Sequence, residues 1–451
     1  MARKMRSSGI EWIGEIPEDW EVIRVKNAAL LKARIGWQGL RSDEFLYEPD
    51  LPLLVTGTDF AGGVVNWNNC VRISEKRFEM DKNIQVKEND LLITKDGTIG
   101  KLAIARNCPE KVSLNSGVFV IRNQGPYKYF DKYMYYLLQS EQFLLWFELN
   151  DTGNSTIRHL YQKDFYNFSF TYPPLEEQEK IADYLDKKTN QIEQIKTAVK
   201  QEIQTLEDYK KSVITEAVTK GLDKNTAMKD SGIEWIGGIP KHWEVKRMKQ
   251  LLSNRADSLK VGPFGSALKS SDLVDDGKWV YNQRAVLDNN FNDNDTFIND
   301  KKFAELKGFK VNAGDVLLTT RGTIGRVAIV PDHFKEGVIH PCIIKFRLSK
   351  DVFKNELIRF IFNDTDIVLK QVEFLSNSTT IGVIYSYNLV NIYVPTPPIS
   401  EQNQIVEYLD KKCTLIDDAI AGKQKQLETL DAYKKSLIYE YVTGKKEVAE
   451  C

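Results

Sequence analysis

The chain contains little cysteine and little histidine, and neither kind of residue clusters. Its five cysteines occur singly along 451 residues, without a CxxC pair, and its four histidines are equally scattered. An odd number of separated cysteines is typical of reduced thiols rather than of a disulfide framework. A structural zinc site needs cysteine and histidine ligands at characteristic spacings, so we expect no zinc site.

Long apolar runs are also missing. No stretch approaches the roughly 20 apolar residues that a membrane-spanning helix needs. The first residues, MARKMRSSG, are basic but lack the apolar segment of a secretory signal. We therefore expect a cytoplasmic protein that does not contact membranes.

Neither sign of charge is in excess. The chain has 62 lysines and arginines against 63 aspartates and glutamates, which leaves a formal net charge of −1. The chain as a whole therefore lacks the positive charge typical of nucleic-acid binding, and any contact with DNA must come from local basic loops. The content of 42% hydrophobic and 11% aromatic residues is ordinary for globular cores, and the length allows two domains plus further helices.

Catalytic motifs are absent as well. The GTIGK segment that ends at Lys101 is not a Walker loop, because the first glycine of GxxxxGK[ST] would fall at Lys95. The two Pro-Pro dipeptides precede Leu175 and Ile399 rather than the aromatic residue of an amino-methyltransferase loop. No set of serine, cysteine or histidine residues has the spacing of a nucleophile and its base. The residues therefore offer no catalytic site.

What the sequence contains is a long helical run that occurs twice. PPLEEQEKIADYLDKK begins at Pro173, and PPISEQNQIVEYLDKK begins 224 residues later, at Pro397. The runs close at Gly221 and Gly444, and neither has an internal proline. Apolar residues recur three and four apart, which predicts one apolar stripe along each helix. The stripes comprise Ile181, Leu185, Ile192, Ile195, Val199, Ile203, Leu206 and Val213 in the first run and Ile405, Leu409, Ile416, Ile420, Leu427, Leu430 and Leu437 in the second.

A helix of this length needs a partner for its apolar stripe. At about 1.5 Å per residue, roughly 45 residues extend about 65 Å, far beyond an ordinary globular helix. The simplest pairing puts the two helices side by side and antiparallel, which relates the two halves of the chain by a pseudo-twofold axis. A generic coiled-coil spacer is the alternative.

Each long helix follows a copy of a second repeated segment, which we call a head. Its lead-in reads SGIEWIGEIPEDWEVIRVK from Ser8 and SGIEWIGGIPKHWEVKRMK from Ser231, and its tryptophans are expected to be packed. Short strands, a helical piece and a return strand follow in both copies, which predicts an α+β domain around a twisted β-sheet. The predicted divisions are head 1 at residues 1–170, the first long helix at 171–222, head 2 at 223–393 and the second long helix at 394–451.

The strongest motif inside the heads is a hairpin with the turn GTIG. DLLITKDGTIGKLAIA in head 1 corresponds to DVLLTTRGTIGRVAIV in head 2. Glycines in a tight turn let the backbone and the threonine hydroxyls approach a phosphate closely, and Lys101 or Arg326 follows the turn. An ordinary hairpin turn is the alternative.

Other loops of the heads carry residue types that bond phosphates or base edges. One loop precedes the middle strand of each head, and another comprises GNSTIRHL in head 1 and SNSTTIGVI in head 2. A solvated loop is the alternative for each. With the hairpins, the candidate DNA-binding residues are Gln38, Lys95, Thr98, Lys101, Asn154, Ser155, Thr156 and Arg158 in head 1 and Ser266, Asn282, Gln283, Arg284, Arg321, Thr323, Arg326, Ser378, Thr379 and Thr380 in head 2.

The heads differ at positions where two DNA readers would differ. Head 2 has the triplet NQR from Asn282, whose side chains can form paired hydrogen bonds with adenine or guanine, whereas head 1 has GTD from Gly57. Arg321 likewise stands where head 1 has Asp96. We predict that the heads read different sequences, and that changing Asn282 or Arg284 alters the half-site of head 2 alone.

The duplicated order of GIEWIG-IP--WEV lead-ins, GTIG hairpins and PP--EQ--I--YLD helix starts resembles the specificity subunit of a type I restriction-modification system. The resemblance covers essentially the whole chain. It implies two target recognition domains, each for one half of a split DNA sequence, joined and spaced by two long antiparallel coiled-coil helices. It also implies that the chain itself has no enzymatic activity.

The resemblance further implies a set of partners. These are double-stranded DNA, two methyltransferase (modification) subunits that methylate adenine, and restriction subunits. S-adenosylmethionine, ATP and Mg would then be bound by the partner subunits, and this chain would hold no cofactor. The methyltransferase subunits are expected to dock on the long helices, at Tyr184, Leu185, Ile192, Leu206, Tyr209, Tyr408, Leu409, Ile416, Leu430 and Tyr433.

Two hypotheses from other classes remain open at this point. The first is a coiled-coil scaffold whose heads bind proteins instead of DNA. Salt-dependent binding of a mixed-sequence duplex distinguishes it from a DNA reader. The second is an enzyme in its own right, which the missing catalytic motifs disfavour.

Overall fold

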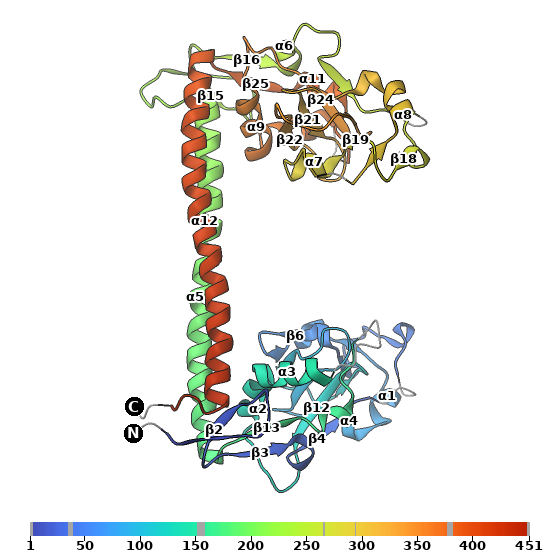
Figure 1. Ribbon diagram of the computed structural model, residues 1–451, viewed down its shortest axis with the longest axis vertical. Helices are drawn as coiled ribbons and strands as arrows, with labels where there is room; N and C mark the ends of the chain where they lie inside the picture. Colours follow the sequence, from blue (N-terminus) through green and yellow to red (C-terminus); the bar gives the residue numbers. More distant parts are fainter. Residues whose placement is uncertain are drawn as a thin grey trace. The chain divides into compact units, whose positions relative to one another are not determined.

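The chain folds into two compact units, and each unit takes residues from both long helices. The computed structural model describes residues 3–34, 39–150, 158–264, 267–293, 295–376 and 382–448. Unit 1 comprises Met1–Val199 with Lys425–Cys451, and unit 2 comprises Lys200–Gln424 (Figure 1). Unit 1 thus contains head 1, and unit 2 contains head 2.

Unit 1 is built on a six-stranded sheet in which β9 and β10 form the predicted hairpin. Its strand order is β4 (Ala29–Lys32), β12 (Val118–Asn123), β9 (Leu91–Thr94), β10 (Leu102–Ile104), β7 (Val64–Val65) and β6 (Phe60–Ala61). A smaller sheet contains β11 (Val112–Leu114), β5 (Leu53–Val55) and β8 (Val71–Arg72). The remaining elements are the pairs β1 (Met5–Ser7) with β2 (Glu15–Pro17) and β3 (Glu21–Arg24) with β13 (Ser169–Tyr172), and the helices α1 (Glu75–Glu79), α2 (Asp131–Gln139), α3 (Glu141–Asn150) and α4 (Gln162–Phe165).

Unit 2 repeats this plan with β21 and β22 as the hairpin. One sheet has the order β17 (Leu259–Val261), β24 (Ile343–Phe346), β21 (Val316–Thr319) and β22 (Val327–Ile329). The other has the order β18 (Leu273–Val274), β20 (Phe297–Ile298), β19 (Lys278–Tyr281) and β23 (Gly337–Ile339). The remaining elements are the pairs β14 (Met228–Asp230) with β15 (Gly238–Pro240) and β16 (Glu244–Arg247) with β25 (Tyr393–Thr396), and the helices α6 (Met248–Leu251), α7 (Gln283–Leu287), α8 (Asp300–Glu305), α9 (Asn355–Asp364), α10 (Ile367–Ser376) and α11 (Ser386–Asn391).

The helical piece predicted in each head is broken into two helices. In unit 1 the break is at Ser140, whose hydroxyl donates to the carbonyl oxygen of Leu137 at 2.6 Å. In unit 2 the break is at Thr365, whose hydroxyl donates to the carbonyl oxygen of Ile361 at 2.6 Å. Both residues adopt an extended backbone, so the hydroxyl competes for the helix's own hydrogen bonds and ends it.

The two long helices are confirmed. They are α5 (Leu175–Lys220), with 46 residues, and α12 (Ile399–Val442), with 44 residues. In unit 1, Lys196 of α5 forms an ion pair with Asp431 of α12 at 2.6 Å, and Glu193 forms one with Lys434 at 3.0 Å. In unit 2, Lys210 of α5 forms an ion pair with Asp417 of α12 at 2.7 Å. Residue numbers that rise along α5 meet numbers that fall along α12, so the helices are antiparallel within each unit (Figure 1). Among the described residues no helix is long and apolar enough to cross a membrane.

A tryptophan of each lead-in is packed as predicted, and a glutamate at the start of a long helix holds it. Trp20 is 1% exposed, and its indole N–H donates to Glu177 of α5 at 2.9 Å. Trp243 is fully buried, and its indole N–H donates to Glu401 of α12 at 2.8 Å. A buried indole needs such an acceptor, which explains why the lead-in and the helix start recur together.

The glutamine that follows each of these glutamates joins the helix start to the head. Gln178 accepts a hydrogen bond from the backbone N–H of Phe130 at 2.9 Å, just before α2. Gln402 accepts one from the backbone N–H of Lys354 at 2.9 Å, just before α9. Both glutamines are fully buried. The repeated Glu-Gln pair therefore fixes each head to the helix that follows it.

An ion pair lies at the base of each hairpin, beside the start of its first strand. In unit 1, Asp90 accepts from Arg122 Nε at 2.8 Å, and in unit 2, Asp315 accepts from Arg347 Nε at 2.9 Å. The side chain of Asp315 is 3% exposed, and the ammonium group of Lys345 lies 3.5 Å from it. A carboxylate so buried needs these cations, so the pair anchors the hairpin in the core.

Candidate nucleic-acid interface

The GTIG turns have the same backbone geometry in both units. Gly97 and Gly100 have φ values of +71° and +82°, in the left-handed region that favours glycine. Lys101 N donates to the hydroxyl of Thr94 at 2.9 Å, and in unit 2 Arg326 N donates to the hydroxyl of Thr319 at 3.0 Å. The sequence reading missed both threonines, although each occupies the same place in its repeat. Their hydrogen bonds hold the two ends of the turn together, and the tip of the turn stays exposed.

The side chains around the turn of unit 1 are partly paired. Lys95 Nζ lies 2.9 Å from Asp96, whose other carboxylate oxygen lies 2.7 Å from His159 Nδ1. Burial acts to raise the pKa of Asp96, but the hydrogen bonds from His159 and Lys95 outweigh it and hold this pKa below its ordinary value. Thr98 and Lys101 are exposed. The turn therefore presents an exposed hydroxyl and ammonium beside a neutralised carboxylate.

Arg158 directly precedes His159 of this cluster in the sequence. Its side chain is exposed, and its guanidinium carbon lies 6.0 Å from the ring centre of Phe147 on α3. Such a contact helps to orient a guanidinium.

In unit 2, Gln283 braces the turn. Its side-chain amide spans the turn backbone, and the orientation assigned from these partners places nitrogen 3.0 Å from the carbonyl oxygen of Arg321 and oxygen 2.7 Å from the N–H of Thr323. Thr323 and Arg321 themselves are exposed. The structure thus brings three predicted residues together but corrects the role of Gln283, whose amide is occupied by protein groups instead of being free for a base.

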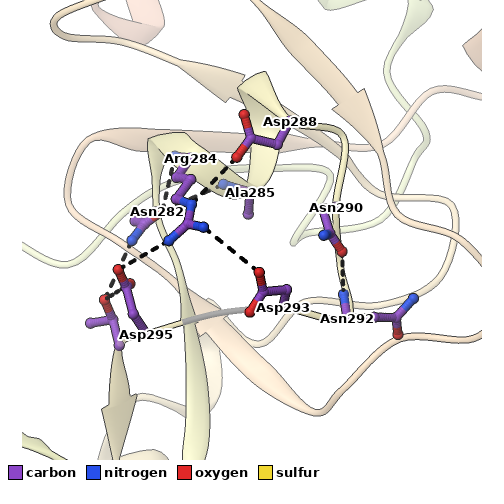
Figure 2. Close-up of polar contacts among 9 residues, drawn as sticks. Asn282, Arg284, Ala285, Asp288, Asn290, Asn292, Asp293 and Asp295 are labelled. Atoms are coloured by element: carbon purple, nitrogen blue, oxygen red, sulfur yellow. Dashed lines mark hydrogen bonds and ion pairs between the residues drawn. The ribbon is translucent and has the colours of Figure 1, made fainter. Parts of the chain in front are cut away.

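Asn282 also has a structural role. Strand β19 ends at Tyr281, because the Asn282 side chain caps helix α7 by accepting from the N–H of Arg284 at 2.9 Å. Its side-chain nitrogen lies 3.3 Å from the hydroxyl of Thr296 (Figure 2). Both ends of the amide are therefore engaged inside the chain, which corrects the prediction that Asn282 bonds a base.

We expect Asn282→Ala to lower the free energy of unfolding by about 0.5–2 kcal/mol, because the cap of α7 is lost. Asn282→Asp keeps a capping oxygen and should be close to wild type in stability. Chemical denaturation of the three proteins measures the difference. If Asn282→Ala kept full stability but changed the DNA sequence recognised, Asn282 would be a base reader after all.

Arg284 faces three carboxylates of the loop that follows α7. Its guanidinium nitrogens lie 3.4 Å from Asp288, 3.7 Å from Asp293 and 3.4 Å from Asp295 (Figure 2). The Arg284 side chain is 57% exposed, and none of these ion pairs is short. The sequence reading missed these aspartates, although the run DNNFNDND shows the negative charge. The guanidinium is accessible, but it must break its ion pairs with these carboxylates to bond a guanine.

Arg326 is exposed at the far end of the turn in unit 2. Its guanidinium donates to the carbonyl oxygen of Asn363 at the end of α9, and the Asn363 side chain in turn accepts from Val327 N at 2.8 Å. The arginine therefore ties the hairpin to α9 while part of its surface stays accessible.

Eight of the predicted DNA-binding residues lie outside the part of the chain that the structure describes. They are Gln38, Asn154, Ser155, Thr156, Ser266, Ser378, Thr379 and Thr380. Their roles stay predictions.

The structure corrects four of the residues predicted to dock a partner. Leu185 and Leu409 are fully buried, Ile192 is 4% exposed and Ile416 is 6% exposed. The apolar stripe packs inside this chain, where α5 and α12 meet each other and the heads, so these side chains cannot also face a partner. Leu206, Leu430 and Tyr184 are half-buried, and Tyr209, Tyr408 and Tyr433 are exposed.

In the six described ranges, no group of three His, Cys, Asp or Glu side chains is placed to hold a metal ion.

Comparison with known proteins agrees with this geometry. The family model of the type I restriction modification DNA specificity domain matches twice, at residues 17–205 and 240–429. The MjaVIII type I restriction enzyme specificity subunit of Methanocaldococcus jannaschii is 27% identical over 96% of this chain and 94% of that protein. The EcoBI specificity subunit of Escherichia coli is 24% identical over 80% of this chain and 74% of that protein.

A solved structure shows the same fold. It is a chain from work on complex assembly and conformational transition of the type I R-M system, with a TM-score of 0.70 and 14% identity. The match covers 96% of this chain and 99% of that one. With two matches that span most of its length, each over one head and one long helix, the chain belongs to the type I restriction-modification DNA specificity subunits.

Proposed function

We propose that each head reads one half of a split DNA target, and that the exposed helix surfaces hold two copies of a modification subunit that methylates adenine. The observation that supports the proposal is that the GTIG turn has the same structure in both heads, while the side chains beside the turn differ. The GTIG turn has the same hydrogen bonds in both units, but His159 and Asp96 stand beside it in unit 1, whereas Gln283 and Arg321 stand there in unit 2. Two such readers recognise unlike half-sites.

The exposed groups of the turns suit contacts with a DNA backbone and its bases. Hydroxyls and cations such as Thr98 and Lys101 bond phosphates, which gives affinity and register. Arg321 and Arg284 carry forked donors that match the O6 and N7 atoms of guanine. The difference in charge between Asp96 and Arg321 supports a difference in the bases that the two heads accept.

The chemistry belongs, in this proposal, to partner subunits. The sequence contains no catalytic motif, and the relatives are named specificity subunits. S-adenosylmethionine, ATP and Mg would be bound by the modification and restriction subunits. The role of this chain is to bind DNA and to position those subunits on it.

Lys101→Ala tests the DNA contact. Removing one phosphate-binding cation should weaken binding of a mixed-sequence duplex by the complex with the modification subunit. It should also lower the slope of log K against log salt by about 1. Fluorescence anisotropy across a salt series measures both quantities.

Lys128→Ala is the matched control. Strand β12 begins beside Thr94 at the turn and ends at Asn123, so the exposed Lys128 lies beyond the other end of the sheet. This variant should leave the salt slope unchanged. An equal loss in both variants would place the contact elsewhere, and no duplex binding at low salt would favour a scaffold whose heads bind proteins.

A further inference from the structure

A cavity of about 750 Å³ opens on the surface of unit 2, where the end of α5 meets α12 and the β14–β15 hairpin. Several of its lining side chains are apolar yet exposed. Tyr209 is 48% exposed, Tyr408 37%, Leu222 41% and Met228 40%, and Ala217 also contributes to the wall. Exposed apolar side chains that gather around one cavity mark a site for another molecule.

Unit 1 shows what fills this place in the other repeat. Tyr184 stands 224 residues before Tyr408, and the same offset relates Tyr209 to Tyr433 and Ala217 to Tyr441. In unit 1 the Tyr441 ring lies against Tyr184, with 4.5 Å between the ring centres, and Tyr441 is 7% exposed. Unit 1 therefore has its own aromatic ring where unit 2 has a methyl group.

Burial raises the pKa of Tyr441, and the hydroxyls of Tyr184 and Tyr433 raise it further. Tyr441 and Tyr184 thus form an aromatic pair in unit 1. In unit 2 the counterparts of Tyr184 and Tyr433, which are Tyr408 and Tyr209, line the cavity, and the counterpart of Tyr441 is Ala217.

We propose that the cavity at Ala217 accepts an aromatic side chain of the modification subunit, which stacks on Tyr408 as Tyr441 stacks on Tyr184 in unit 1. The inference rests on the proposed function, because that function supplies the protein partner. Tyr441 identifies the chemical class of the occupant, and Glu216 and Lys220 at the wall can bond a phenolic hydroxyl. The cavity also continues the surface expected to dock the partner, since Tyr209 and Tyr408 belong to it.

The difference between the repeats has a consequence for assembly. Two identical partner subunits approach two similar surfaces, but at this place unit 2 has room for an inserted ring, whereas Tyr441 fills the corresponding place in unit 1. A buried aromatic anchor contributes strongly to an interface. The first modification subunit therefore binds unit 2 more tightly than the second binds unit 1.

Ala217→Tyr tests the proposed insertion, because the new tyrosine ring would fill the cavity with a side chain of this chain. We expect the tighter of the two binding steps to weaken at least about tenfold, as measured by calorimetric titration of the full chain with purified modification subunit. Ala217→Ser leaves the cavity open and should bind as wild type does. Tyr441→Ala opens the equivalent place in unit 1 and should strengthen the weaker step relative to the tighter one.

The outcomes separate this inference from the proposed function. If wild type binds two modification subunits and Ala217→Tyr leaves both affinities unchanged, the inference is wrong while the function stands. If wild type binds none, the proposed function itself fails. Should Ala217→Tyr not fold, Tyr408→Ala removes the stacking wall instead. A tighter step that stays unchanged in Tyr408→Ala would equally overturn the inference.

Discussion

A chain in which residues 231–396 are replaced by a second copy of residues 8–172 should direct methylation to two copies of the head 1 half-site. The exchange points lie at the repeated SGIEWIG and before the repeated Pro-Pro, so the lead-in and the return strand move as a block. The lead-in tryptophan of the inserted block keeps its acceptor, because Glu401 stands where Glu177 does.

Sequencing that detects methylated adenines measures this result in cells that express the chimera with the modification subunit. The matched control replaces residues 231–396 with themselves through the same cloning junctions and should keep the asymmetric target. If the chimera still directed methylation to the original head 2 half-site, head 2 would not be the part of the chain that recognises this half-site. Loss of methylation with a folded chimera would show that the heads are not interchangeable.

Asp315→Ala should destabilise unit 2 by about 3–5 kcal/mol. The change leaves Arg347 and the 3%-exposed Lys345 without their shared carboxylate in the core. It also removes the oxygen that accepts from Asn312 N at 2.9 Å, which holds the turn before β21. Removing one partner of a buried pair leaves an uncompensated charge, so the loss exceeds that of a surface ion pair.

Denaturation followed by tryptophan fluorescence measures this loss. Asp275→Ala, at an exposed position of the same head, makes the same chemical change and should stay within about 0.5 kcal/mol of wild type. A loss below about 1 kcal/mol in Asp315→Ala would mean that Lys345 and Arg347 find other partners. The anchoring role of the pair would then be wrong.

The repeated elements of the fold were predictable from the sequence, because duplication reveals pattern without any other protein for comparison. The long helices extend from Leu175 to Lys220 and from Ile399 to Val442, within two residues of the predicted prolines and glycines. Their antiparallel pairing was predicted as the simplest arrangement that covers both apolar stripes. The hairpin turns were likewise visible in the glycines of GTIG.

Side-chain roles in the loops were not predictable, because local hydrogen bonds decide them. Asn282 and Gln283 are of the right type to read bases, but the first caps α7 and the second braces the turn at Thr323. For a related reason, the sequence did not show whether the apolar stripe of each long helix faces a partner or the chain's own core. Leu185 and Leu409 suit a partner or the chain's own core equally well, and only the packed structure shows that the core uses them.

The most direct test of the account is a map of methylated adenines in cells that express this chain with its modification subunit. The proposed function predicts one split target with two unlike half-sites at a fixed gap, and loss of all such methylation when this chain is omitted. Methylation that persists without the chain, or that marks a continuous target with no gap, would contradict the account.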